Sequence, residues 1–282
     1  MIAALTALAA AGLWGTSDFL GGLFSRGRSA VIVLGVAQAA GLVAIALVMV
    51  VWAGPFPGTA ILAPSLLAGS VGLGVLALYR ALAIGPMSVV APLGALAAVV
   101  PVVVGIAGGD RVSVLQVVGM AAAVVGCFLA ARAPSDEPAP APGSRAGIAY
   151  ALVAALLIGL GFVGLEDAAD EDVLWGLGLS RAVAVVALVV ATIVVAVRGT
   201  PVAGQIAPLA PLVVVGLLDM SANGLFAYAS TLGLLSVTSV LSSVYPVATV
   251  LLARVVLHER MVRPQVAGVV IAFGGIALLA AG

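Results

Sequence analysis

Residues 110–129 read DRVSVLQVVGMAAAVVGCFL, and residues 259–278 read ERMVRPQVAGVVIAFGGIAL. The two stretches align without a gap, because residue 110 pairs with residue 259 and the offset of 149 is kept to the end. Upstream, ALAIGPMS at 81–88 resembles ASTLGLLS at 229–236 at an offset of 148. Apolar helices rich in Ala, Val and Gly align easily, but polar matches at a fixed register favour an internal duplication. The polar and glycine matches are Asp110 with Glu259, Arg111 with Arg260, Gln116 with Gln265, Gly119 with Gly268 and Gly126 with Gly275.

The composition is that of a membrane protein. Only 8% of the 282 residues are charged and 64% are hydrophobic, with a mean hydropathy of +1.34, whereas a soluble domain carries roughly 25% charged residues. Eleven arginines balance eleven acidic residues, so nothing suggests a nucleic-acid surface. Cys127 is the single cysteine, which excludes a disulfide framework and a cysteine-based metal site. The first apolar run lacks a basic start and continues to Phe24, so we interpret it as a retained helix rather than a cleaved signal.

The apolar runs predict ten transmembrane helices, since a helix needs about 20 apolar residues to cross the bilayer core. The Pro-rich stretch 132–145, RAPSDEPAPAPGSR, cannot form such a helix and is interpreted as a linker. We therefore expect an all-α membrane protein in which residues 1–131 and 146–282 form two five-helix repeats around a central cavity. Five helices per repeat invert the second repeat relative to the first, as in many secondary transporters. The predicted helices are 2–24, 30–53, 61–83, 87–108, 112–131, 146–165, 173–197, 206–232, 235–257 and 263–281.

The arginines predict the orientation. With ten helices, the side opposite most of the basic residues holds Arg111 and the acidic stretch EDAADED at 166–172, which is expected to be a solvated external loop. Arg181, near a helix start, is a second candidate for that side. The positive-inside rule then makes the linker 132–145 cytoplasmic and places both termini outside a cell (inner) membrane. The arginines on the cytoplasmic side are Arg26, Arg28, Arg80, Arg132, Arg145, Arg198, Arg254, Arg260 and Arg263.

Four segments resemble a known family: WGTSDFLGG at 14–22, ASTLGLLSV at 229–237, SSVYPVATVLLARVVLHER at 242–260, and the Gln-x-x-Gly of 265–268. They resemble the EamA family of the drug/metabolite transporter superfamily. The second repeat is the clearer match, because the first has Ala97 where the second has Tyr245. The resemblance implies a central cavity lined by the first four helices of each half, with the fifth and tenth helices outside it. It also implies transport of amino acids or other metabolites, by exporters or importers, without fixing the substrate.

Asp18 is the first candidate for the substrate site, because a charge within the hydrocarbon is costly unless it is paired. It lies about 9 Å from the cytoplasmic end of its helix at 1.5 Å per residue, and Trp14 lies one turn earlier on the same face. Its carboxylate could carry a proton or bind a cationic group. Alternatively, it could form an ion pair with Arg26 or Arg28 that fixes the helix end.

Asp219 and Arg181 are the other ionisable candidates. Asp219 lies near the middle of the eighth helix, with Asn223 one turn on and Tyr228 nearby, and should face either a cavity or a neighbouring helix. Arg181 could clamp a substrate carboxylate, or it could neutralise Asp219 or Glu166 and bind nothing. If Asp219 serves transport, Asp219→Asn is expected to remove transport and spare the fold.

Several uncharged residues complete the predictions. Gln38, Tyr79, Ser242 and Tyr245 add polar groups to the candidate substrate site. The prolines predict interruptions of the helices, most simply kinks, and two sets of small residues predict close helix packing. The prolines are Pro92, Pro101 and Pro246, and the small residues are Gly119, Ala123 and Gly126 with their mates Gly268, Ala272 and Gly275.

These observations predict a secondary transporter of a small metabolite or amino-acid-like solute, working by alternating access and favouring export over import. No Walker motif is present in the sequence, and proton coupling and passive exchange both stay open. The alternatives are a channel-like facilitator and, less favoured, an intramembrane enzyme using Asp18 and Asp219 as a pair. We expect no cofactor, no metal and no nucleic acid. The expected partners are lipid and a small-molecule substrate, with the chain a monomer or a homodimer.

Overall fold

The computed structural model describes residues 1–25, 30–84, 93, 95–130, 144–197, 209–257 and 262–281. Arg26, Arg28, Pro92 and residues 132–143 of the linker lie outside the described residues, while the last two residues of the predicted linker, 144 and 145, belong to the first turn of a helix. Within these ranges the regular elements are all helical. They are α1 (Ile2–Ser25), α2 (Ala30–Trp52), η1 (Thr59–Ile61), α3 (Leu62–Gly69), α4 (Val71–Ile84), η2 (Ala95–Ala98), α6 (Val99–Gly108), α7 (Val114–Ala130), α8 (Ser144–Glu171), α9 (Val173–Val197), α10 (Leu209–Ser230), α11 (Leu235–Ser242), α12 (Tyr245–Val256) and α13 (Arg263–Ala281).

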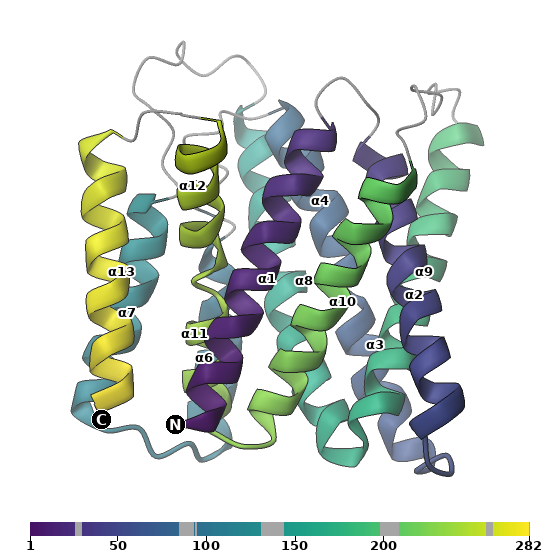
Figure 1. The fold of residues 1–282 in the computed structure, drawn as a ribbon, viewed down its shortest axis with the longest axis horizontal. Coiled ribbons are helices and arrows are strands. Elements are labelled where there is room, and N and C mark those ends of the chain that lie inside the picture. Colours follow the sequence, from purple (N-terminus) through teal and green to yellow (C-terminus); the bar gives the residue numbers. More distant parts are fainter. Residues whose placement is uncertain are drawn as a thin grey trace.

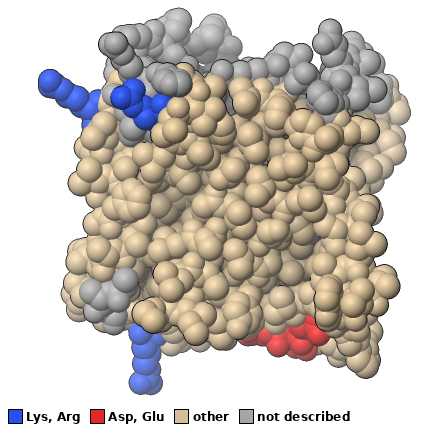
Figure 2. All heavy atoms as spheres, in the orientation of Figure 1, with Lys and Arg blue, Asp and Glu red and all other residues tan. Residues whose placement is uncertain are grey.

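The surface of the helices is apolar, as expected in lipid. Among the described residues, seven helical spans are long and apolar enough to cross a membrane, and three shorter apolar helices accompany them. Leu47, Val190 and Phe273 are among many large apolar side chains left exposed, which would be unusual on a soluble protein. In Figure 2 the charged residues on the visible face lie at its two ends, with uncharged residues between them. The expected multi-pass, all-α membrane architecture is therefore confirmed.

The helices stand side by side, and those from distant parts of the chain are neighbours (Figure 1). Both marked termini lie at the same end of the bundle. α1 packs against α10 and α12, and α4 packs against α8, so that helices of the two halves alternate through the structure. Asp110 adds a polar link, because its Oδ2 accepts a hydrogen bond of 2.9 Å from the backbone N–H of Ser236 near the start of α11. The two halves thus share one packed interior.

Two of the predicted helices are broken within the bundle. The span predicted at 61–83 divides into α3 and α4 around Ser70, whose hydroxyl donates to the carbonyl of Leu157 on α8, 2.9 Å away. The span predicted at 235–257 divides into α11 and α12. Pro246 is the second residue of α12 and Pro101 the third of α6, positions where a helix has no need of the missing N–H. These prolines begin helices instead of bending them.

One predicted boundary is wrong. The acidic stretch 166–172 was expected to be an external loop, but α8 continues to Glu171. Glutamate is a good helix former, and a helix that has reached the membrane surface can extend into water with its charged side chains solvated. The acidic residues 166–172 therefore show where the apolar part of α8 ends, but the helix itself continues through them.

The small-residue faces of α7 and α13 meet as predicted. A Cβ atom added to Gly126 would lie 2.3 Å from the backbone nitrogen of Ala272, and one added to Gly268 would lie 2.3 Å from that of Ala130. Real Cβ atoms do not approach so closely, so only glycine fits at these two positions. Contact at this distance between backbones is the usual reason for small residues in membrane helix pairs. α7 and α13 form a tight pair at one edge of the bundle (Figure 1).

Candidate functional site

A cavity of about 440 Å³ lies within the bundle. Its described walls come from α1, α2, α3, α4, α8, α9, α10 and α12, and none of its lining residues belongs to α7 or α13. Most of the lining is apolar. On α1 the lining residues run from Trp14 to Gly22, and on α2 from Val33 to Gln38. Along α1 and α2 the cavity therefore extends toward the end of the bundle where α1 finishes and α2 begins, while on α9 its lining runs from Leu177, near the start of that helix, to Ala184.

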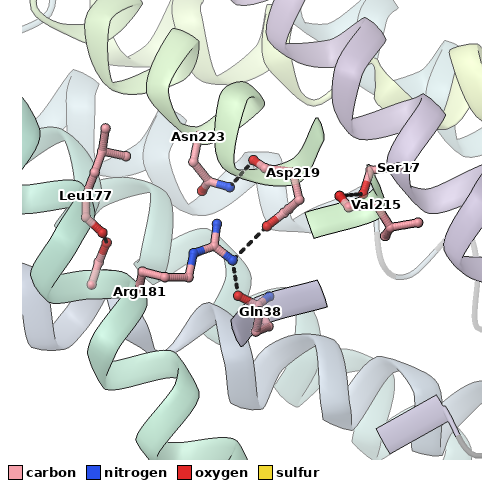
Figure 3. Close-up of polar contacts among 8 residues, drawn as sticks. Ser17, Gln38, Leu177, Arg181, Val215, Asp219 and Asn223 are labelled. Carbon is pink, nitrogen blue, oxygen red and sulfur yellow. Dashed lines mark hydrogen bonds and ion pairs between the residues drawn. The ribbon is translucent and has the colours of Figure 1, made fainter. Parts of the chain in front are cut away.

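A buried ion pair crosses one wall of the cavity. Nη1 of Arg181 on α9 lies 2.8 Å from Oδ2 of Asp219 on α10, with the two side chains 6% and 27% exposed. The same nitrogen donates to Oε1 of Gln38 on α2. Figure 3 shows the guanidinium between these two partners. Arg181 is thus ion-paired with Asp219, and Gln38 joins α2 to the pair.

The neighbouring polar side chains are bonded to backbone carbonyls. Nδ2 of Asn223 donates to the carbonyl of Asp219 at 2.7 Å, one turn back on α10. The hydroxyl of Ser17 on α1 donates to the carbonyl of Val215 on α10 at 3.1 Å, and that of Thr249 on α12 donates to the carbonyl of Gly15 on α1 at 3.1 Å. These bonds tie α1 to both α10 and α12 beside the cavity and leave few polar groups unsatisfied.

Asp18 differs from the other charged lining residues. It lines the cavity from α1, and its side chain is exposed although the residue lies deep in the bundle. Within the described residues it has neither a hydrogen bond nor an ion pair. Arg26 and Arg28, its alternative partners from the sequence, lie outside the described residues. The exposed surface of Asp18 is therefore the surface it presents to the cavity.

Aromatic rings pack together at the inner end of the cavity. The ring centroid of Trp14 lies 5.3 Å from that of Phe162, 5.9 Å from that of Phe226 and 6.3 Å from that of Tyr245. Phe162 and Phe226 are themselves 5.0 Å apart. Such offset and tilted pairs stabilise by about 0.5–1.5 kcal/mol beyond the area they bury. The rings come from α1, α8, α10 and α12. Trp14, Phe162 and Tyr245 line the cavity and are here called the aromatic floor, and the fully buried Phe226 packs against Trp14 and Phe162.

The structure brings together most, but not all, of the residues predicted for the site. Tyr228 is 49% exposed and does not line the cavity, and Ser242 is fully buried, with its hydroxyl donating to the carbonyl of Ala7 at 3.3 Å. Tyr79 lies on α4, with its side chain outside the described part of the structure. The cavity is lined by the other predicted residues, which are Trp14, Asp18, Gln38, Arg181, Asp219, Asn223 and Tyr245.

Some lining residues were missed from the sequence. Phe162 lies in a run of Gly, Leu and Val that gives no sign of a site, and Ser17 and Thr249 are common types in membrane helices. No group of three or more His, Cys, Asp or Glu side chains is placed to hold a metal ion in the described ranges. The described lining offers charged groups, hydrogen-bonding groups and apolar contact.

Comparison with known proteins agrees with this geometry. Residues 145–281 match the EamA-like transporter family, so the resemblance predicted from the sequence is confirmed for the second half of the chain. No curated protein sequence matches the chain. A solved structure described as "Crystal structure of protein" has 16% sequence identity and a TM-score of 0.78, covering 98% of this chain and 95% of its own. At that identity the likeness concerns the fold alone.

Proposed function

We propose that this chain, whose residues 145–281 match the EamA-like transporter family, is a secondary transporter that moves a small organic solute across the cell membrane by alternating access. The observation that carries the proposal is the buried Arg181–Asp219 pair on the wall of a cavity. Charged side chains inside a membrane protein are costly and mark substrate or ion pathways. Apolar walls with a few convergent polar groups are the usual form of a small-molecule site.

The proposed architecture is two inverted five-helix repeats, residues 1–131 and 146–282, joined by a cytoplasmic linker. The seven long and three shorter apolar helices supply ten crossings if each crosses once. The cavity has walls from both halves, and the polar network itself joins Gln38 of the first half to Arg181 and Asp219 of the second. A site shared by two repeats is what alternating access requires, since rocking one repeat against the other changes the side from which the site is reached.

The position of the cavity supports export as the proposed direction of transport. It extends toward the end of the bundle where α1 finishes, which is the cytoplasmic end in the orientation predicted from the arginines. A cavity placed in this way would load from the cytoplasm, so we favour export.

A counterflow experiment tests the proposal against the channel-like alternative. Purified protein in liposomes is loaded with a cytoplasmic metabolite extract, and solutes lost relative to empty liposomes are identified by mass spectrometry. Each such solute is then labelled and offered outside, with and without unlabelled solute inside. A carrier shows faster labelled uptake when unlabelled solute is present inside, because the loaded cavity returns faster than the empty one. If the rate of labelled uptake does not depend on the solute inside, the protein is a facilitator. If the liposomes that contain the protein lose no solute relative to empty liposomes, the proposal is wrong.

The enzyme alternative is less well supported. A catalytic pair of carboxyl groups shares a proton between them. Here Asp219 is ion-paired with Arg181, and Asp18 has no hydrogen-bonded partner among the described residues. We therefore propose transport and no catalysis.

A further inference from the structure

The ionisable side chains that line the cavity are not all paired. The described lining contains three of them, Asp18, Arg181 and Asp219. Arg181 and Asp219 form an ion pair at 2.8 Å. Asp18, on α1, is the acidic side chain of the described lining that has no ion-pair partner among the described residues.

Arg181 is poorly placed to receive an anionic substrate. Its side chain is only 6% exposed and is held by both Asp219 and Gln38. A substrate carboxylate that took the place of Asp219 at Nη1 would leave the Asp219 carboxylate unpaired in the interior, which is costly. Arg181 is the basic side chain of the described lining, and it is already ion-paired.

Asp18 is well placed to receive a cation. Its carboxylate is exposed in the cavity, and a charge at this depth is stabilised by an opposite charge that also donates hydrogen bonds. Trp14 lines the cavity one turn away on the same face of α1. A tryptophan ring attracts ammonium groups to its face, and the contacts of Trp14 with Phe162 and Tyr245 hold the ring in place.

We propose that the transported solute is a hydrophobic organic monocation, a protonated amine without a carboxylate, whose ammonium group binds Asp18 and whose hydrocarbon body lies on the aromatic floor. This inference rests on the proposed transport function and names its substrate class. It narrows the amino-acid-like solute expected from the sequence, because the α-carboxylate of an amino acid has no free partner in the described lining. The apolar remainder of the cavity wall matches a hydrocarbon body.

Binding to purified protein tests the substrate class without reference to transport. The probes are three matched sets, each with an amine, its amino acid and a neutral alcohol: phenethylamine, phenylalanine and 2-phenylethanol; tryptamine, tryptophan and tryptophol; isoamylamine, leucine and isoamyl alcohol. Isothermal titration calorimetry measures each Kd. We expect the amine to bind at least tenfold more tightly than its two partners in one set or more. Equal or weaker binding of the amine in all three sets would overturn the proposal.

Variants locate the binding group. Asp18→Asn should weaken amine binding by tenfold or more and leave the alcohols unchanged, and Asp18→Glu should keep the preference for the amine. Asp170→Asn is the matched control, since it removes the same charge from an exposed residue outside the cavity, and it should change nothing. Amine binding that survives Asp18→Asn would refute the assignment to Asp18. If counterflow is observed but no amine binds preferentially, the proposed substrate class is wrong and the proposed transport function stands. If an amine binds preferentially but no counterflow is observed, the proposed transport function is wrong.

Discussion

Replacing Asp219 with asparagine should destabilise the fold as well as affect transport. The amide keeps the shape of the side chain, but it leaves the guanidinium of Arg181, 6% exposed, without its charged partner. Removing one member of a buried ion pair costs roughly 3–5 kcal/mol, because the remaining charge is uncompensated. Asp219 is 27% exposed toward the cavity, so water can reach the pair and we expect the lower end, about 3 kcal/mol. This revises the expectation from the sequence that Asp219→Asn would spare the fold.

A double-mutant cycle measures the pair itself. Arg181→Gln should cost less than Asp219→Asn, since the carboxylate it leaves behind is the more exposed partner. The double variant Arg181→Gln/Asp219→Asn removes both charges and should lie within about 1 kcal/mol of the wild type, because neutral replacement of a buried pair is often tolerated. The coupling energy between the two sites should then be at least about 2 kcal/mol.

Unfolding of the detergent-solubilised protein by a denaturing detergent gives the free energy of each variant, by extrapolation to zero denaturant. Transport per folded molecule is measured on the same preparations. If the double variant loses as much free energy of unfolding as the two single variants together, the interaction between Arg181 and Asp219 contributes nothing to stability. Wild-type stability in Asp219→Asn would contradict the reasoning directly.

Three further predictions concern packing and orientation. Gly126→Ala should lower the free energy of unfolding by about 1–3 kcal/mol, because the new Cβ would meet the backbone of α13. Gly12→Ala, whose new Cβ would have nothing within 4 Å, should leave stability unchanged or raise it, and unfolding in detergent measures both variants. Asp110→Ala should lower stability by about 1 kcal/mol, the usual value for a lost helix cap, and equal stability would show that its bond to Ser236 is dispensable. A reporter active only in the cytoplasm should be silent when fused after Gly282, and a signal would refute the predicted orientation.

Apolar length predicted the long helices well. α9 spans Val173–Val197 and α2 spans Ala30–Trp52, within a residue of the ranges expected. The breaks could not be predicted, because the hydropathy of a run is unchanged when its hydrogen bonds are interrupted. Ser70 is a case in point: its break is stabilised by a bond to Leu157 on another helix, which no local pattern contains. The inverted relation of the two halves stays a prediction from the sequence repeat.

The cost of burying charge predicted which residues gather around the cavity, but not how they pair. The buried charges of Arg181 and Asp219 each required a partner. That Gln38 also bonds to Arg181 depends on how α2 packs against α9, which the sequence does not reveal. Tyr228 could have been excluded from the sequence. It follows Asp219 by nine positions, about two and a half helical turns, and therefore lies on the opposite face of α10, while Asn223 lies on the same face.

The pairing of α7 with α13 has a consequence for biosynthesis. α7 leaves the ribosome long before its partner, and its glycine face, including Gly119 and Gly126, must remain in the bilayer without the backbone it fits. During that interval the stripe is open to lipid, to insertion factors or to quality-control proteases. The nascent protein should therefore be most vulnerable to degradation between membrane entry of α7 and that of α13. Pulse-chase of chains that stop after α12 should show faster turnover than that of the complete chain, even though the cavity-lining helices are already present.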